Sequence, residues 1–181
     1  DDFEIPFEIR DELDAYVSPK PERAEELRRI LEEKGKLEPK DFWPWLQYLS
    51  TWKCGNTKIY MDKYMDQFNW DKTFYQELGY IATECRFGFS LDDTNESVLF
   101  PHFHYYEFVE ESELDSPHKH FLQIYELEQG KRYCAYVTTY SGLFRYNMND
   151  LVEVGGNYYN TPTVHMISKV NGIVSMTGEK L

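Results

Sequence analysis

Cysteine is scarce in this chain, and the few that occur limit its chemistry. Cys54, Cys85 and Cys134 have no spacing typical of a metal site and cannot all pair with one another. No apolar run reaches the roughly 18 residues that suggest a membrane helix, and no signal peptide opens the chain. We therefore expect reduced, buried thiols in a cytoplasmic protein that has no membrane partner.

Basic residues are also few compared with acidic ones. The chain carries 19 Lys and Arg against 32 Asp and Glu, which gives a formal net charge of −13. Nucleic acids and anionic lipids would repel such a chain, so we expect neither as a direct partner. Small anions such as nucleotides respond to local fields, and the net charge does not exclude them.

The glycine-rich motifs that bind phosphate in many nucleotide-dependent proteins are absent. The chain has neither a Walker-type loop nor the dinucleotide fingerprint, and no Ser/Thr/Gly-rich loop replaces them. Aromatic residues, in contrast, make up 17% of the 181 residues, and disordered chains are poor in aromatics. A folded domain with a sizeable core is therefore expected.

Helix signals and aromatic runs alternate in the first half of the chain. Ser18 as cap and Pro19 at the first helical position predict a helix that Gly35 ends. The aromatic run at 45–52 predicts a buried strand, and residues 73–81 predict another strand.

A second helix is expected between these two strands, with Asn56 as its cap. Its apolar residues recur at helical spacing and are expected to pack in the core; they are Met61, Tyr64, Met65 and Phe68. Residues 46–84 therefore predict a β-α-β unit.

From about residue 97 the sequence changes to short β-prone runs separated by turns. The predicted strands cover residues 97–100, 105–109, 121–127, 133–139, 143–146, 151–154 and 163–168. Glycine marks the expected turns at Gly130, Gly142 and Gly155–Gly156. Short turns favour antiparallel pairing, so we expect an α/β segment over residues 1–96 and an antiparallel, barrel-like β region over residues 97–168.

Tyr80-Ile-Ala-Thr-Glu84 is the first segment that could carry chemistry, because a strand ends there in a hydroxyl and a carboxylate. Magnesium prefers hard oxygen ligands and is commonly held by one or two carboxylates together with substrate phosphates. Such a pair suits a reaction in which charge builds up on phosphate oxygens. The alternative for Thr83 and Glu84 is an ordinary strand end with exposed polar residues.

Asp150 ends the second segment, Tyr140-Ser-Gly-Leu-Phe-Arg-Tyr-Asn-Met-Asn-Asp150. A carboxylate has two acceptor oxygens and can accept hydrogen bonds from both adjacent hydroxyls of a ribose. The alternative is an Asp in a turn that bonds its own backbone. Arg145, in the same segment, is interpreted as a structural residue that makes an ion pair across the sheet.

The third segment, Lys169-Val-Asn-Gly-Ile-Val-Ser-Met-Thr-Gly-Glu-Lys180, lies at the end of the chain and contains an Asn-Gly pair, which favours a turn. Two histidine pairs lie elsewhere in the sequence, His102 with His104 and His118 with His120. Neither pair has an adjacent cluster of Cys or Asp, so both are interpreted as surface residues and not as metal ligands.

The order and spacing of the three segments resemble the late motifs of the adenylate-forming enzymes, and most closely those of the auxin-responsive acyl-acid amido synthetase family. The resemblance implies a catalytic pair in which Thr83 contacts phosphate and Glu84 holds Mg²⁺. It also implies that Tyr80 lies against the adenine and that Asp150 binds the ribose. Lys169 stands at the position of a basic residue that contacts the nucleotide in many of these enzymes, where Arg is commoner.

The resemblance also places the chain within a larger enzyme. It implies the second half of a large domain, in which residues 169–181 form the hinge to a C-terminal lid that is absent here. Asn171 stands where many relatives carry a hinge Asp and where the auxin-type branch tends to Asn. The phosphate loop and the lid lysine would then belong to the rest of the parent chain, so we expect this chain alone to be incomplete and inactive.

The implied activity is that of an ATP-dependent ligase with ATP and Mg²⁺ as cofactors. A carboxylic acid would react with ATP to give an acyl-adenylate and pyrophosphate, and the amine of an amino acid would then displace AMP to give an amide. Three alternatives stay open: transfer to a thiol such as coenzyme A, a non-catalytic module that binds nucleotide or acid, and a purely structural α/β domain.

Overall fold

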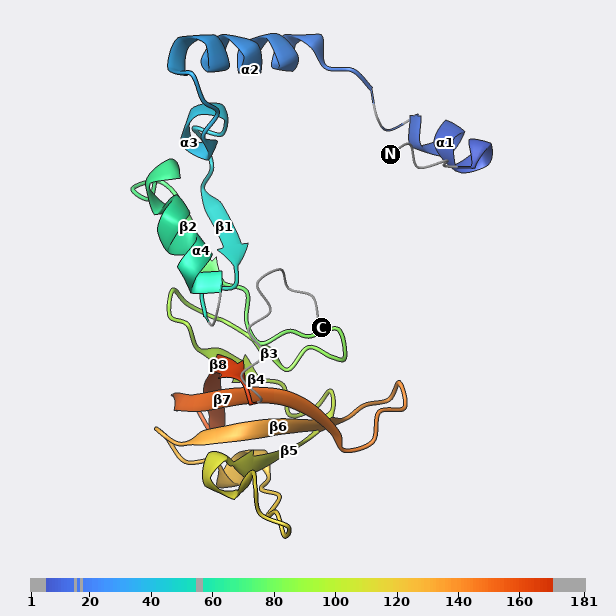
Figure 1. The fold of residues 1–181 in the computed structure, drawn as a ribbon, viewed down its shortest axis with the longest axis vertical. Helices are drawn as coiled ribbons and strands as arrows, with labels where there is room; N and C mark the ends of the chain where they lie inside the picture. Colours follow the sequence, from blue (N-terminus) through green and yellow to red (C-terminus); the bar gives the residue numbers. More distant parts are fainter. Residues whose placement is uncertain (1–5, 15, 17, 55–56, 171–181) are drawn as a thin grey trace. The chain divides into compact units, whose positions relative to one another are not determined.

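The computed structural model describes residues 6–14, 16, 18–54 and 57–170, and the chain divides into two compact units, residues 1–44 and 45–181. The described residues of the first unit form the helices α1 (Phe7–Asp14), α2 (Pro21–Lys34) and α3 (Pro39–Phe42) (Figure 1). None of the helices in the described ranges is long and apolar enough to cross a membrane. The division of the sequence at residues 96 and 168 stays a prediction.

Helix α2 begins two residues later than predicted. Its N-cap is Lys20, whose side chain makes no capping hydrogen bond, and Pro21 occupies the first turn. The residue before a proline is pushed out of the helical region, and Lys20 accordingly has φ −118° and ψ 79°. The helix therefore cannot run through from Pro19. The predicted end is confirmed, because Gly35 adopts a left-handed conformation with φ 71° and donates to Leu31 O.

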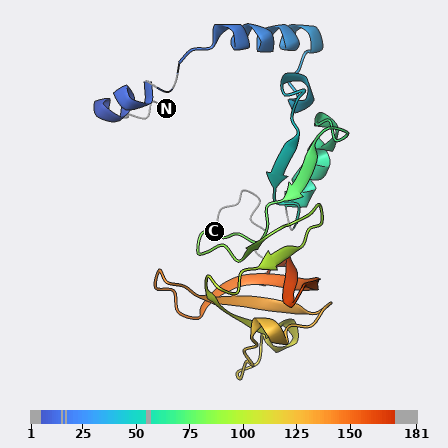
Figure 2. The same ribbon diagram turned by 180° about the vertical axis from the view of Figure 1, so that it is seen from behind.

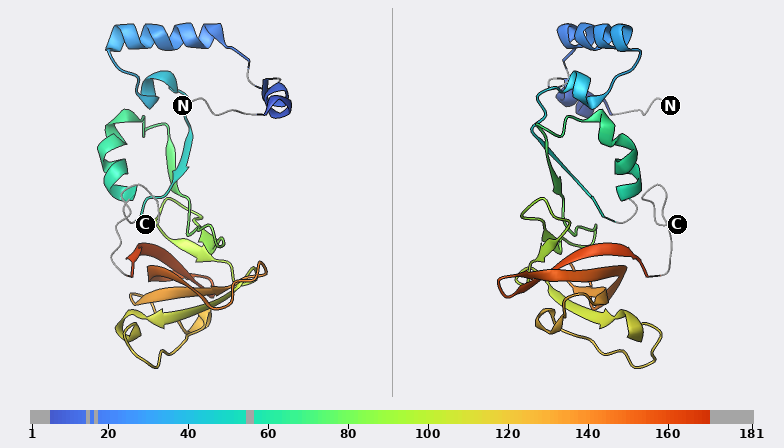
Figure 3. Two further views of the ribbon diagram at one scale, coloured as in Figure 1. Left: turned by 45° about the vertical axis from the view of Figure 1, so that its right-hand side comes forward. Right: turned by 90° about the vertical axis from the view of Figure 1, so that its left-hand side faces the viewer.

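The second unit opens with the predicted β-α-β arrangement. Strand β1 (Tyr48–Thr51) pairs in parallel with β2 (Phe74–Glu77), and α4 (Thr57–Tyr64) with the short η1 (Met65–Gln67) connects them. In Figure 3, α4 lies along one side of the strand pair. Parallel strands require such a crossover, which explains why a helix separates them.

Burial in this β-α-β unit differs from the prediction. Strand β1 covers only four residues, half-buried or exposed, and not a buried run over residues 45–52. None of the described residues of α4 is buried, and the predicted core residues Tyr64 and Met65 are exposed. A sheet of two strands is too narrow to cover a helix, which explains why the stripe is not packed in a core. The predicted cap, Asn56, lies outside the described residues.

The remaining strands form one six-stranded antiparallel sheet, as predicted (Figure 2). Its order is β3-β4-β8-β7-β6-β5. The strands are β3 (Gly88–Phe89), β4 (Ser97–Leu99), β5 (Tyr105–Glu110), β6 (Arg132–Thr138), β7 (Tyr146–Tyr158) and β8 (Thr161–Lys169). Two short 3-10 helices, η2 (Glu111–Glu113) and η3 (Ile124–Glu126), lie between β5 and β6 along the chain.

The sheet curls around its core, so that residues beside its two edge strands meet. Phe87, directly before β3, stacks on Tyr80 with ring centroids 4.2 Å apart and contacts Tyr106 of β5 at 5.0 Å. The Tyr106 hydroxyl also donates to Arg86 O at 3.4 Å. These rings belong to one core cluster with Leu99, Phe108, Tyr133, Val137, Val152 and Val164. The curl accounts for the barrel-like character expected from the sequence.

Three predictions for this sheet are wrong. In the predicted strand at residues 121–127, Leu122 makes only an isolated bridge to Phe108, and Ile124–Glu126 form η3, because Gln123 and Glu126 bond each other's backbone in a capping box. The predicted strands at 143–146 and 151–154 are not separate strands: residues 143–145 precede β7, which begins at Tyr146 and includes residues 151–154. The Gly155–Gly156 pair lies inside this strand, at an irregularity in the β7–β8 register, and not in a turn.

Gly155 has a packing reason to lack a side chain. A Cβ placed there would lie 2.1 Å from Glu96 Oε1, in the space that the Glu96 carboxylate occupies. The same oxygen lies 2.7 Å from His165 Nδ1 on β8. This hydrogen bond is the largest cause that raises the pKa of His165 above its ordinary value of 6.5. The pair therefore connects β8 to the residue before β4.

We expect this pair to make stability depend on pH. Because the folded-state pKa of His165 is raised above the unfolded value, its contribution is fully present below about pH 6.5 and is lost as the pH rises through the folded pKa. Gly155→Ala would displace the flexible Glu96 carboxylate and abolish this dependence. The measurement is the free energy of unfolding in urea from pH 5.5 to 8.5. Gly156→Ala is the control, because its Cβ would meet nothing closer than 3.9 Å. If the free energy of unfolding changed equally with pH in both variants, the Glu96–His165 pair would not be the cause of the pH dependence.

Candidate functional site

The Tyr80–Glu84 segment follows the carboxyl end of the parallel strand β2. Ile81 forms an isolated bridge with Arg86, and Ala82 N donates to Cys85 O at 3.0 Å. Thr83 and Glu84 occupy the tip of the turn that these bonds close, with Thr83 exposed and Glu84 half-buried. Ligands of open α/β sheets bind beyond the carboxyl ends of parallel strands, so this turn is well placed for the predicted phosphate and metal contacts.

Asp150 occupies a core position in β7. Alternate residues of this strand point into the sheet's interior, and Met148, Val152 and Val154 are all buried there. Asp150 belongs to the same alternation and is only 2% exposed. A carboxylate at a core position is costly unless partners compensate its charge, so its surroundings require an explanation.

Two partners compensate this charge, and both are residues that the sequence had singled out. The Tyr80 hydroxyl donates to Asp150 Oδ2 at 2.9 Å, and the Lys169 ammonium forms an ion pair with Asp150 Oδ1. Lys169 also lies 3.3 Å from Met148 O and stands opposite Asp150 in the β7–β8 register. We call Tyr80, Asp150 and Lys169 the Asp150 cluster. It brings together three segments that are far apart in the sequence.

The cluster fixes the protonation of Tyr80. Burial raises the pKa of this phenol well above its ordinary value of 10, and the charge of Asp150 raises it further. Tyr80 is therefore a hydrogen-bond donor to the carboxylate at every physiological pH. Burial likewise raises the pKa of the nearby Cys134 thiol to about 11.

The Asp150 cluster is closed in this structure. Each Asp150 oxygen already accepts a bond, and the side chain of Asp150 is 3% exposed against 28% for Lys169. Tyr80 is buried, with its ring stacked on Phe87 at an interplanar angle of 16°. Contact of Tyr80 with adenine stays a prediction, and it would require this stack to open.

Arg145 makes the ion pair across the sheet that the sequence predicted. Its guanidinium donates two hydrogen bonds of 2.8 Å to Glu107 of β5, a carboxylate that is 4% exposed. It also lies over the ring of Phe121, 4.6 Å from the centroid. This bidentate contact holds the segment before β7 in place. It also occupies two N–H donors of the guanidinium, which are then not available to a ligand.

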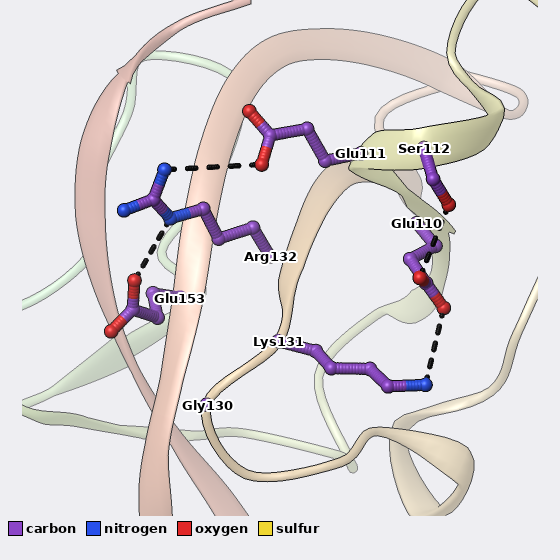
Figure 4. A pocket seen from close by; sticks show the side chains of 7 residues that line it. All are labelled: Glu110, Glu111, Ser112, Gly130, Lys131, Arg132 and Glu153. Carbon is purple, nitrogen blue, oxygen red and sulfur yellow. Dashed lines mark hydrogen bonds and ion pairs between the residues drawn. The ribbon is translucent and has the colours of Figure 1, made fainter.

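A charged hollow lies outside the predicted site (Figure 4). It is lined by Glu110, Glu111, Ser112, Gly130, Lys131, Arg132 and Glu153. In Figure 4, Arg132 reaches from β6 toward Glu153 of β7, at 2.9 Å, and toward Glu111. Glu153 is out of phase with the inward-pointing Val152 and Val154, so the hollow is on the sheet's outer face. Its partly exposed ion pairs satisfy one another and indicate no ligand.

The described residues contain no group of three or more His, Cys, Asp or Glu side chains that could hold a metal ion. His102, His118 and His120 are exposed, whereas His104 is half-buried against Tyr106. All three cysteines are unpaired, and two of them are buried. Magnesium is commonly held by one or two carboxylates together with phosphates, and the role of Glu84 as its ligand stays a prediction.

Two stretches of the chain match known domains. Residues 2–73 match the GH3 family N-terminal domain, and residues 97–169 match the GH3 family central domain. The second stretch contains five of the six strands of the antiparallel sheet, together with Asp150 and Lys169.

Curated proteins similar to this chain carry names from the same family. The "Probable indole-3-acetic acid-amido synthetase GH3.6" of Oryza sativa subsp. japonica is 28% identical over 166 residues, which cover 84% of this chain and 33% of that protein. The "4-substituted benzoates-glutamate ligase GH3.12" of Arabidopsis thaliana is 27% identical over 176 residues, which cover 90% of this chain and 28% of that protein. The chain spans about a third or less of the length of these relatives.

Solved structures share its fold. The GH3.15 acyl acid amido synthetase matches with a TM-score of 0.67 at 23% identity, over 84% of this chain and 27% of that chain. A structure of AtGH3.15 acyl acid amido synthetase in complex with 2,4-DB matches with a TM-score of 0.69 at 22% identity, over 84% of this chain and 26% of that chain. The fold is thus that of part of an acyl acid amido synthetase. The chain belongs to the GH3 family.

Lys169 is expected to be essential for stability because Asp150 is buried. Lys169→Met would leave the carboxylate without its cation and lower the free energy of unfolding by about 3–5 kcal/mol. Adding Asp150→Asn should recover part of the loss, because no charge then remains buried. Urea unfolding of both single variants and the double variant measures this coupling. Lys131→Met, which removes the two more exposed ion pairs of Lys131 with Glu110 and Glu128, should leave stability nearly unchanged; a similar loss in both Lys variants would contradict the prediction.

Proposed function

We propose that this chain is part of an ATP-dependent ligase that adenylates a carboxylic acid and transfers the acyl group to an amino acid. The observation that carries the proposal is the Asp150 cluster. Three residues from separate sequence segments, each expected to contact the nucleotide, meet in one place, although 70 positions separate Tyr80 from Asp150 along the chain. An ordinary strand end and an ordinary turn would have no reason to coincide in this way.

In the first step, the carboxylate of the acid attacks the α-phosphorus of ATP, and pyrophosphate leaves with the bonding electron pair. Negative charge increases on the phosphate oxygens as this happens, and a magnesium ion bound with ATP would neutralise part of it. Glu84 would hold that ion, and the exposed Thr83 hydroxyl would donate to a phosphate oxygen. Their turn supports this role, because both side chains lie at its tip.

Asp150 would accept hydrogen bonds from the two ribose hydroxyls in the nucleotide complex. For this the cluster has to open, and Lys169 is the partner able to move, because its flexible side chain is the more exposed. Released from Asp150, the ammonium could pair with the nucleotide phosphates. Tyr80 would stay bonded to Asp150 Oδ2 and keep the carboxylate in place, and contact of its ring with adenine is a further element of the proposal.

In the second step, an amine attacks the acyl carbon of the acyl-adenylate, and AMP leaves. An amino acid acceptor is supported by the names of the relatives, one a probable indole-3-acetic acid-amido synthetase and one a 4-substituted benzoates-glutamate ligase. Transfer to a thiol is the alternative outcome, and a product assay with glutamate or coenzyme A as acceptor separates the two. We also propose a cytoplasmic location and dependence on the rest of the parent chain for the phosphate loop and lid.

The first step is tested by exchange between ATP and labelled pyrophosphate. We expect the full-length protein that carries this chain to catalyse exchange that depends on a carboxylic acid and on Mg²⁺. Glu84→Gln should lower the rate by about a hundredfold, because it removes a charged contact used in the transition state. Asp150→Asn should raise the KM for ATP, because an amide cannot accept at both positions.

The control is Glu32→Gln, which changes an exposed carboxylate on α2 and should leave exchange unaltered. Nucleotide binding without exchange for any acid of a wide panel would favour the non-catalytic module. Exchange that survives both Glu84→Gln and Asp150→Asn unchanged would keep the enzyme and refute the residue assignments. Circular dichroism of each variant separates these outcomes from a loss of folding.

A further inference from the structure

The backbone immediately before Asp150 adopts a conformation that side-chain-bearing residues rarely take. Asn149 has φ 56°, in the left-handed region that costs most residues about 1 kcal/mol or more. Non-glycine residues persist there only where the surroundings hold them, and such positions cluster at functional sites. Asn tolerates the region better than most residues, but it still requires support.

Asn149 lies in a β-bulge. Cys134 pairs with Leu151 and Tyr136 pairs with Asn147, so β7 has three residues, Met148 to Asp150, where β6 has only one. A bulge bends its strand and re-aims the side chains within it. This bulge therefore determines where the carboxylate of Asp150 points.

The side chain of Asn147 supports the bulge. Its Oδ1 accepts the backbone N–H of Asn149 at 2.8 Å and lies 3.3 Å from the Cys134 sulfur on the neighbouring strand. Burial raises the pKa of Cys134 to about 11, so at neutral pH its thiol is protonated and can donate this second bond. On its other side, Asn149 O accepts the N–H of Val170, next to Lys169.

From this geometry we propose that Asn147 is a positioning residue of the nucleotide site. By holding Asn149 in its left-handed turn, it aims the Asp150 carboxylate at Tyr80 and, in the complex, at the ribose. Asn147 itself is exposed and touches neither Tyr80 nor Asp150 in the bonds described above, so its effect passes through the backbone. The ribose part of this inference rests on the proposed function, whereas the aim of Asp150 does not.

The test uses four variants of the full-length protein that carries this chain. Asn147→Ala removes the acceptor, and Asn147→Asp keeps it in the same shape. Asn149→Gly gives the backbone its left-handed turn without support, because glycine enters that region freely. The double variant Asn147→Ala/Asn149→Gly asks whether glycine replaces the hydrogen bond. Asn157→Ala, an exposed Asn at the far end of β7, is the matched control.

In ATP–pyrophosphate exchange, Asn147→Ala should raise the KM for ATP by about tenfold with kcat changed less than about twofold. The reason is that the Asp150 carboxylate is misoriented toward the ribose, whereas the groups that contact the reacting phosphate are unchanged. Asn147→Asp and the double variant should return KM to within about twofold of the wild type. An unchanged KM in Asn147→Ala, or a double variant that stays as defective as the single one, would overturn the proposal.

A readout without activity separates this inference from the proposed function. Tyr80→Phe removes the hydrogen bond to Asp150 and should lower the melting temperature of the wild type. In the Asn147→Ala background, the same change should have a much smaller effect, because Asp150 no longer points at residue 80. Equal effects in both backgrounds would refute the positioning role. The presence of this coupling together with no pyrophosphate exchange would instead refute the proposed function alone.

Discussion

The buried carboxylate of Asp150 is the constraint on which the rest of the structure depends. A charge at a core position of a strand is costly unless partners compensate it, and in this structure a cation and a hydrogen-bond donor lie beside it. Lys169 supplies the cation from the paired strand β8, and Tyr80 supplies the donor from the segment that follows the parallel strands. The Asp150 side chain therefore connects β7, β8 and the segment between the two sheets. The same contacts hold the candidate site in its conformation and pack this part of the core.

The candidate site has two parts with different physical character. The turn at Thr83 and Glu84 is accessible and suits highly charged groups, which keep part of their hydration when they bind there. Asp150 is enclosed and suits a neutral diol, whose hydroxyls can replace the ammonium of Lys169 as hydrogen-bond donors. A nucleotide has both kinds of group at its two ends. The burial of these residues shows an exposed part and an enclosed part, and their match to the phosphates and the ribose belongs to the proposed function.

The sequence predicted the elements whose signals are local. Gly35 ended its helix as expected, and the crossover between β1 and β2 followed from two apolar runs separated by a helical stripe. Thr83, Glu84 and Asp150 were candidates because a hydroxyl and carboxylates follow β-prone runs, whereas Tyr80 and Lys169 were implied only by the family resemblance. What failed depended on distant partners: Gly155 resembles a turn residue until Glu96, far away in the sequence, is seen to fill its side-chain space. Asn147 and the left-handed Asn149 gave no sequence signal beyond an Asn-rich stretch, because a bulge is defined by the neighbouring strand.

The order of the strands in the antiparallel sheet has a consequence for how the molecule assembles. Strands β5 to β8 follow one another along the chain and pair with their successors, so most of the sheet grows from contacts between neighbours in sequence. Strand β4 instead pairs with β8, with Ser97 opposite Val164. Closing so long a loop costs entropy before any contact compensates it, and such pairings slow folding. The step that brings β4 to β8 also brings Phe87 against Tyr106, and it carries Tyr80 toward Asp150. We therefore expect the Asp150 cluster to be completed only when this long-range pairing is made, so that an incompletely folded chain lacks the candidate site.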